Sequence, residues 1–424
     1  MRRHDAQLSP SRQRGALNAD TADQRARLGP AAGLERTLLG ALHRLTGEPS
    51  IRLLLWDGYA VGPDSARYSI EILDRGALYQ LLRSPNINFG ELYSAGRVRV
   101  HGDLSDMLVE AYRHIERVHR GWPAWLAALW RSRPRRGADL DGARHNIQHH
   151  YDLGNDFYRL WLDSAAMQYT CAYFASPDMN LEQAQLAKLE HVCRKRRLQP
   201  GEEVIEAGCG WGGLARDMAQ HYGVRVRAFN ISREQLAWAR EQAARDGLAD
   251  RVEYVEDDYR NITGRCDKFV SVGMLEHVGP ANYAALAGVI GRTLKPDGLG
   301  LVHTIGRNRP GPVNGWIEKR IFPGSYVPSI TELMRLFEDG GFSVLDVENL
   351  RLHYARTLEH WRARYLDARE QVRADYDERF ARAWELYLAG ARAGFVAGTM
   401  QLFQVVFAPA ESNSLPATRR DLYA

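Results

Sequence analysis

The chain has 424 residues and a mass of 48.0 kDa, enough for about two or three domains of ordinary size. Its hydrophobic fraction of 45% and charged fraction of 25% exclude wholesale disorder and fibrous repeats. A net charge of +4 is too mild to indicate nucleic-acid binding, four cysteines are too few for a disulfide scaffold, and no apolar run is long enough to span a membrane.

The N-terminal part predicts a loose arm followed by a small domain. Residues 1–33 are rich in Arg, Ala, Asp and Gln, with little periodicity and no apolar segment typical of a secretory signal. Between 34 and 120, the apolar runs Ile51–Trp56 and Tyr68–Leu73 predict strands, and Asp103 is placed to cap a helix. We therefore expect a flexible arm and an α+β domain over 34–120 of a reduced, cytoplasmic protein.

Residues 121–144 form a Trp- and Arg-rich linker. Its apolar side chains recur at helical spacing, and a basic run with Pro134 and Gly137 follows. A Trp and Leu face that ends in arginines suits the surface of a membrane with anionic lipid. A helix packed against a neighbour, followed by a solvated linker, explains the same pattern. The apolar positions are Trp122, Trp125, Leu126, Leu129 and Trp130.

Residues 145–410 alternate between strand and helix patterns, which predicts a mostly parallel sheet covered on both faces. Helices are expected at 213–222, 232–246, 281–294 and 329–339, and 411–424 is expected to be a tail. The last strand is expected to be antiparallel. The predicted strands are Glu203–Ala207, Val224–Phe229, Val252–Val255, Lys268–Val272, Leu299–Ile305, Ser343–Glu348 and Met400–Phe407.

A glycine-rich turn, EAGCGWGG, follows the first of these strands. It begins at Glu206 and places Gly208, Gly210 and Gly212 where backbone must approach a ligand closely. The pattern resembles the first motif of class I S-adenosylmethionine (SAM)-dependent methyltransferases. In open α/β sheets, ligands bind at the carboxyl ends of the strands.

Five motifs in order make the chain resemble the cyclopropane-fatty-acyl-phospholipid synthases and the related cyclopropane mycolic acid synthases. They are HYDLGNDFYRLWLD at 150–163, YTCAYF at 169–174, EAGCGWGG, SVGMLEHVG at 271–279 and LVHTIG at 301–306. The segment ELYSAGRVRVHGDL resembles the N-terminal lipid-docking domain of the phospholipid enzymes. The resemblance implies a Rossmann-like class I methyltransferase fold with a seven-stranded, mostly parallel sheet.

The resemblance also implies a site. A bicarbonate ion would be held by Cys171, Glu276, His303, the backbone of Ile305, and Tyr354. SAM would be bound by Tyr169, Thr170, Glu206, Gly208, Cys209, Gly210, Gly212, Asn230, Ser232, Gln235 and Asp258. A buried carboxylate beside an anion is costly, so we expect Glu276 to be protonated or to share a proton, and His303 to donate to the anion. Taken alone, each residue fits an ordinary core or cap role.

By resemblance, the methyl group of SAM is transferred to a cis double bond of an acyl chain, and the resulting carbocation loses a proton to bicarbonate as the ring closes. A methyl- or methylene-branched product from the same cation remains an alternative, as do a non-catalytic lipid- or SAM-binding protein and a small-molecule O- or N-methyltransferase. The expected partners are unsaturated phospholipid, the inner face of an anionic membrane as a peripheral site, and a second copy in a homodimer.

No metal is expected. His145, His149 and His150 lie close together, but no acid or cysteine follows at ligand spacing.

Overall fold

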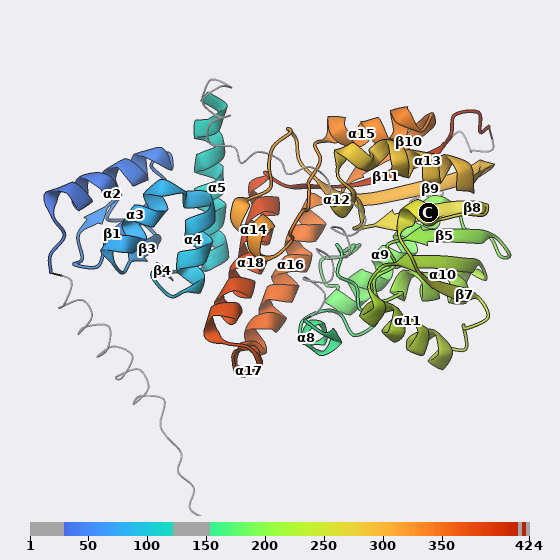
Figure 1. Cartoon of the computed structure of the whole chain (residues 1–424), viewed down its shortest axis with the longest axis horizontal. Coiled ribbons are helices and arrows are strands. Elements are labelled where there is room, and N and C mark those ends of the chain that lie inside the picture. Colours follow the sequence, from blue (N-terminus) through green and yellow to red (C-terminus); the bar gives the residue numbers. More distant parts are fainter. Residues whose placement is uncertain (1–28, 122–152, 414–417, 421–424) are drawn as a thin grey trace, which may run out of the picture. The chain divides into compact units, whose positions relative to one another are not determined.

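A computed structural model of the chain describes residues 29–121, 153–413 and 418–420, and divides it into two compact units between Gly121 and Trp122 (Figure 1). The tryptophans and arginines of the predicted linker, like His145, His149 and His150, lie outside the described residues. No helix in the described part of the chain is long and apolar enough to cross a bilayer.

The first unit is an α+β domain, as predicted. Its sheet has the order β2-β1-β3-β4, in which only β1 and β3 run parallel. Asp103 caps α5, because its carboxylate accepts a hydrogen bond from Asp106 N at 2.9 Å. The strands are β1 (Ile51–Leu55), β2 (Ala60–Val61), β3 (Tyr68–Ile72) and β4 (Val98–His101). The helices are α2 (Gly33–Leu45), α3 (Arg75–Arg83), α4 (Pro85–Ser94) and α5 (Leu104–Gly121).

Residues 29–32, which were expected in the arm, belong to this first unit, as does Gly33 at the start of α2. The indole of Trp56 donates to the carbonyl of Gly29 at 3.0 Å, and Ala31 N donates to Asp57 at 2.9 Å. Ala31 is buried. These contacts attach the chain to the domain before the predicted boundary.

The second unit contains the predicted seven-stranded sheet, in the order β10-β11-β9-β8-β5-β6-β7. The antiparallel orientation of the last strand is confirmed, and this strand lies inside the sheet, between β9 and β10. The pairs β9–β8, β8–β5, β5–β6 and β6–β7 are parallel. The strands are β5 (Glu203–Ala207), β6 (Arg225–Asn230), β7 (Val252–Glu256), β8 (Cys266–Val272), β9 (Leu294–Gly306), β10 (Phe342–Asn349) and β11 (Gln401–Pro409).

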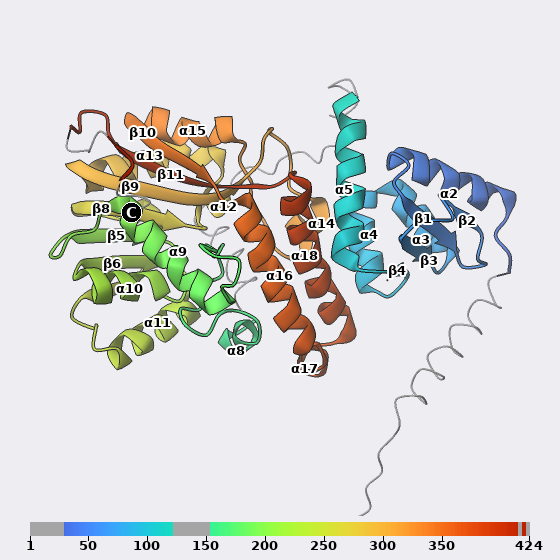
Figure 2. The ribbon, with the colours of Figure 1, turned by 180° about the vertical axis from the view of Figure 1, so that it is seen from behind.

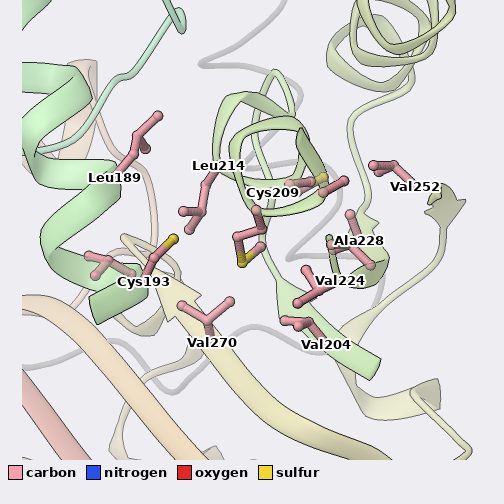
Figure 3. Packing of buried hydrophobic residues seen from close by; sticks show 14 of the residues in the cluster. Leu189, Cys193, Val204, Cys209, Leu214, Val224, Ala228, Val252 and Val270 are labelled. Atoms are coloured by element: carbon pink, nitrogen blue, oxygen red, sulfur yellow. The ribbon is translucent and has the colours of Figure 1, made fainter. Parts of the chain in front are cut away.

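Helices cover both faces of this sheet. On one face pack α9 (Leu181–Arg196), α10 (Gly213–Tyr222) and α11 (Arg233–Arg245), and on the other α13 (Tyr283–Thr293) and α15 (Ile330–Asp339). Figure 2 shows α9 lying across its face of the sheet. Figure 3 shows Leu189 and Cys193 of α9 in the same buried cluster as Val204 and Val270 of the strands. The helical predictions for this unit are therefore confirmed.

An aromatic cluster joins the segment after residue 153 to the helices that lie between strands β10 and β11 in the chain. The helix α8 (Asn155–Arg159) begins the segment, and Trp161 packs edge-on against Trp361 with ring centroids 5.6 Å apart. Figures 1 and 2 both show α16 and α18 side by side. The remaining helices are α12 (Leu275–Val278), α14 (Gly315–Arg320), α16 (Arg351–Asp367), α17 (Arg369–Asp375) and α18 (Glu378–Ala397).

Candidate active site

A pocket lies at the carboxyl ends of β5, β6 and β8. It encloses about 1060 Å³ of space between atoms, part of it open to solvent. Nine of the eleven residues predicted to bind SAM line it, whereas Gly212 and Ser232 do not. The nine are Tyr169, Thr170, Glu206, Gly208, Cys209, Gly210, Asn230, Gln235 and Asp258.

Gly212 and Ser232 shape the pocket from behind. Gly212 has φ +74° at the start of α10, and a Cβ there would lie 2.4 Å from the hydroxyl of Tyr254. That hydroxyl donates to the carbonyl of Gly212 at 3.0 Å, so strand β7 supports the turn. Ser232 caps α11 by accepting from Gln235 N. The positions of both residues fit a structural role in holding the loops.

Asn230 ties the end of β6 to the glycine turn. Its Nδ2 donates to the carbonyl of Gly210 at 3.2 Å and to Gln235 at 2.8 Å, and its Oδ1 accepts from Ile231 N at 2.8 Å. The buried carboxylate of Asp258 accepts from Arg260 N at 3.0 Å. The pocket wall is thus built from side chains that are already hydrogen-bonded to backbone.

Glu206 lies beneath the glycine turn with 2% of its surface exposed. Burial raises its pKa to about 7, although Arg196 and Lys188 oppose the shift. Among the described residues, its Oε2 has no hydrogen-bond partner. Glu206 is therefore placed at the pocket with one carboxyl oxygen available.

The sequence analysis missed several pocket residues, including Gln168, Trp211 and His277. The indole of Trp211 donates to Asn155 Oδ1 at 2.7 Å, which joins the glycine turn to α8. Trp211 stands within the glycine motif, so its place in the sequence could have predicted that it lines the pocket.

Lys188 was also missed. It is fully buried behind the pocket, donates to the side chains of Gln168 and Thr170, and has a pKa that burial lowers to about 8. The surrounding helix pattern gave no sign that this lysine would be inside.

Glu276 and Ile305 meet at the end of β8. Glu276 Oε1 accepts from Ile305 N at 2.6 Å, while Oε2 is buried and has no partner among the described residues. Burial raises the pKa of Glu276 to about 7. The resemblance assigned the backbone of Ile305 to the anion site, and in this structure the N–H of Ile305 donates to Glu276.

His303 lies on β9 two residues before Ile305, with 2% of its surface exposed. Its Nδ1 is 3.0 Å from Gln404 Nε2, and its Nε2 has no partner among the described residues. Burial, assisted by Lys188 and Lys195, lowers the pKa of His303 to about 3. The ring is therefore neutral at physiological pH.

The other two predicted residues are Cys171 and Tyr354; Tyr354 lies on α16, and Cys171 lies near the start of that helix. Cys171 is fully buried, its thiol donates to the carbonyl of Ala172, and burial raises its pKa, so it is a thiol rather than a thiolate. Tyr354 stacks on Phe395 with ring centroids 4.6 Å apart.

Backbone contacts connect these groups. Leu350 at the start of α16 donates to the carbonyl of Leu402, which pairs with Ile305 across β11 and β9. The Cys171 sulfur is 4.0 Å from the carbonyl of Leu350. The fold thus places a neutral histidine, a buried carboxyl group and a buried thiol on neighbouring segments at the carboxyl end of the sheet.

Within residues 29–121, 153–413 and 418–420, no three His, Cys, Asp or Glu side chains gather as they would around a metal ion.

The family model "Mycolic acid cyclopropane synthetase" matches residues 139–405. A probable fatty acid methyltransferase from Pseudomonas putida is 36% identical over 388 residues, 88% of this chain and 96% of that protein. The cyclopropane-fatty-acyl-phospholipid synthase of Escherichia coli K12 is 43% identical over 271 residues, 64% of this chain and 69% of that protein.

A crystal structure of the mycolic acid cyclopropane synthase CmaA1, complexed with SAH and CTAB, superposes with a TM-score of 0.59 at 32% identity. It covers 62% of this chain and 97% of that one. Two findings agree on the family: the glycine turn lies at the switch point of the sheet, and the family model matches residues 139–405. The chain belongs to the mycolic acid cyclopropane synthetase family and is a SAM-dependent methyltransferase.

Proposed function

We propose that the enzyme is a cyclopropane-fatty-acyl-phospholipid synthase, which transfers a methylene group from SAM to the cis double bond of unsaturated acyl chains in membrane phospholipids. The observation that carries the proposal is a pair of buried, unpaired polar atoms near the end of β9, Glu276 Oε2 and His303 Nε2. Buried polar atoms are rarely left without a partner. Their presence near the pocket supports a bound group that accepts hydrogen bonds from both.

Bicarbonate fits this pair. Its anionic oxygens can accept a hydrogen bond from the protonated carboxyl group of Glu276 and another from the donor nitrogen of the His303 ring. When bound, it supplies the base that the carbocation intermediate requires. Cys171 and Tyr354 would complete the binding site.

The protein's own contribution is to exclude water and to limit charge. A carbocation exposed to water would be trapped as an alcohol, so the reaction needs a dry site. Burial keeps Glu276 protonated at pH values well above the ordinary carboxyl pKa. Burial also keeps the His303 ring neutral. The site then carries little charge of its own and can accept an anion without a large electrostatic penalty.

A methyl- or methylene-branched product is the second candidate. A relative that matches 88% of this chain bears the name probable fatty acid methyltransferase, whereas the E. coli synthase matches 271 residues, 64% of this chain. Both kinds of product start from one cation: loss of a proton from the new methyl as the ring closes gives the cyclopropane, whereas a 1,2-hydride shift before that proton leaves gives a methylene branch. A saturated methyl branch would also need a hydride donor. The orientation of the base relative to the new methyl group would decide between them.

Mass spectrometry of lipids tests both candidates. Purified enzyme, SAM and vesicles of cis-monounsaturated phospholipid should give an acyl chain about 14 mass units heavier, the mass of one methylene. If that product resists hydrogenation, it contains a ring. Uptake of two hydrogens would indicate a methylene-branched alkene, and a methyl-branched saturated chain would differ from the ring product by two hydrogens. Absence of any product, with SAM still bound, would refute the proposal.

A matched variant and a depletion experiment address the base. The Glu276→Gln variant should bind SAM normally and lose product formation, because the amide cannot share a proton with bicarbonate. Removal of dissolved carbonate should lower the native rate, and added bicarbonate should restore it. A native rate that ignores carbonate would refute bicarbonate as the base while leaving methyl transfer intact.

We further propose that the protein binds the inner face of the membrane peripherally, as a cytoplasmic homodimer. The support is the sequence of 121–136, with its Trp face and basic run. Replacing Trp122, Trp125 and Trp130 with Ala should reduce co-sedimentation with anionic vesicles, and salt should weaken native binding. Unchanged binding of the variant would contradict this role. Sedimentation equilibrium would test the dimer.

A further inference from the structure

The polar side chain that contacts His303 comes from β11. Gln404 is fully buried and pairs with His303 across the two strands, so both side chains stand on the same face of the sheet. The Nε2 of the amide lies 3.0 Å from His303 Nδ1. A neutral imidazole has one donor and one acceptor nitrogen, and the amide offers a donor nitrogen or, if turned by about 180°, an acceptor oxygen. The direction of this hydrogen bond therefore has to be settled by the other contacts of the amide.

Lys195 determines that direction. Its side chain is fully buried, and Nζ donates to the Oε1 of Gln404 at 2.8 Å. An ammonium group has three donors and no acceptor. The amide must therefore present its oxygen to Lys195 and its nitrogen to His303, which makes Nδ1 the acceptor.

Lys195 is itself anchored. Its Nζ lies 2.5 Å from Glu348 Oε2 and 4.0 Å from Asp346 Oδ2, and His191 holds the same Glu348 oxygen at 2.8 Å. Burial opposes ionisation of Glu348, but the bonds from His191 and Lys195 prevail and lower its pKa to about 2. An ionised carboxylate at this position pairs with the lysine and holds its side chain in place.

We propose that Gln404, held by Lys195, is a positioning residue that keeps His303 in the tautomer with its proton on Nε2. That nitrogen is the buried atom without a partner, so the tautomer turns it into a donor directed at the bound anion. Because the pKa of His303 lies near 3, no second proton can supply that donor at neutral pH. The catalytic consequence rests on the proposed function, whereas the tautomer itself does not.

The native protein allows a direct test. In enzyme labelled with ¹⁵N-histidine, two-bond ¹H–¹⁵N spectra distinguish a protonated from an unprotonated ring nitrogen, and comparison with a His303→Asn sample identifies the signals. We expect His303 to show protonated Nε2 and bare Nδ1 from pH 6 to pH 9. A proton on Nδ1 would overturn the proposal without any reference to activity.

The Gln404→Glu variant tests the consequence. The substituted carboxylate has only acceptors, so it keeps the contact with Lys195 but must receive a proton from Nδ1, which moves the ring proton away from Nε2. We expect the tautomer to switch and kcat to fall by about 100-fold, the usual loss for one donor to a reacting oxyanion. SAM affinity should stay within about twofold.

A matched control separates this effect from the burial of a carboxylate. Gln401 is also buried on β11, and its side chain bonds to Asn349 and Gly398. The Gln401→Glu variant should leave the His303 signals unchanged and most activity intact. A switched tautomer with near-native kcat in Gln404→Glu would overturn the positioning role. An Nε2-protonated native enzyme that makes no product would refute the proposed function and leave the tautomer assignment standing.

Discussion

The ionisation of Glu276 should make the enzyme less stable as the pH rises, and the Glu276→Gln variant should remove that dependence. Burial raises the pKa of this carboxyl group from an ordinary 4.5 to about 7. At 1.36 kcal/mol per pKa unit, keeping the group ionised in the folded protein costs about 3 kcal/mol.

The direction follows from proton binding. Between pH 4.5 and pH 7 the folded chain holds this proton and the unfolded chain does not, so rising pH favours unfolding. An amide at this position stays neutral throughout and can still accept from Ile305 N. The stability of Glu276→Gln relative to native should therefore increase by about 2–3 kcal/mol from pH 5 to pH 8.

Urea unfolding of both proteins at pH 5 and pH 8, monitored by near-UV circular dichroism of the aromatic cluster, gives the four free energies of unfolding. From these we obtain the change in relative stability between the two pH values. Glu206, whose pKa also lies near 7, contributes equally to both proteins and cancels. Parallel stability profiles would show that Glu276 ionises at no cost. That result would refute the reasoning that its second oxygen lacks a partner.

Three further predictions concern the pocket and the thiols. Gly212→Ala should lower stability by at least about 1–3 kcal/mol, since the new methyl would clash with Tyr254 at positive φ, and calorimetry should detect no SAM binding. Trp211→Phe loses the bond to Asn155 and should raise the Kd for SAM by about 5- to 10-fold, with an unchanged Kd contradicting a role for this bond. All four cysteines are buried, so iodoacetamide at pH 8 should leave the native protein unmodified and add four adducts in urea. A native adduct on any of them would contradict the described burial.

Strands of the second unit were predictable because a sheet covered on both faces needs continuous apolar runs. Their observed ends lie within two residues of the predicted ones, except in β9. That strand begins at Leu294, five residues before the predicted start. The early start was not predicted because the sequence Lys295–Gly298 is typical of a turn. The helices of the first unit that precede Asp103 were not predicted.

The prediction of the site depended on short motifs, so residues outside those motifs were missed. Residues inside short motifs, such as Glu276 and His303, could be named by resemblance. Lys195 could not, because RKRR at a helix end is typical of a solvated face, yet this lysine is fully buried. Gln404 stands in an apolar strand 101 residues from its partner, and only tertiary pairing brings them together.

The interior place of β11 has a consequence for the order of assembly. The strand inserts between β9 and β10, so its pairs with β9 span about a hundred residues of chain, and contacts of such sequence separation form slowly. The wall of the SAM pocket, by contrast, comes from residues 167–278. A chain in which β11 has not yet inserted would have the nucleotide pocket but no fixed His303, and would be able to hold the methyl donor without the means to use it.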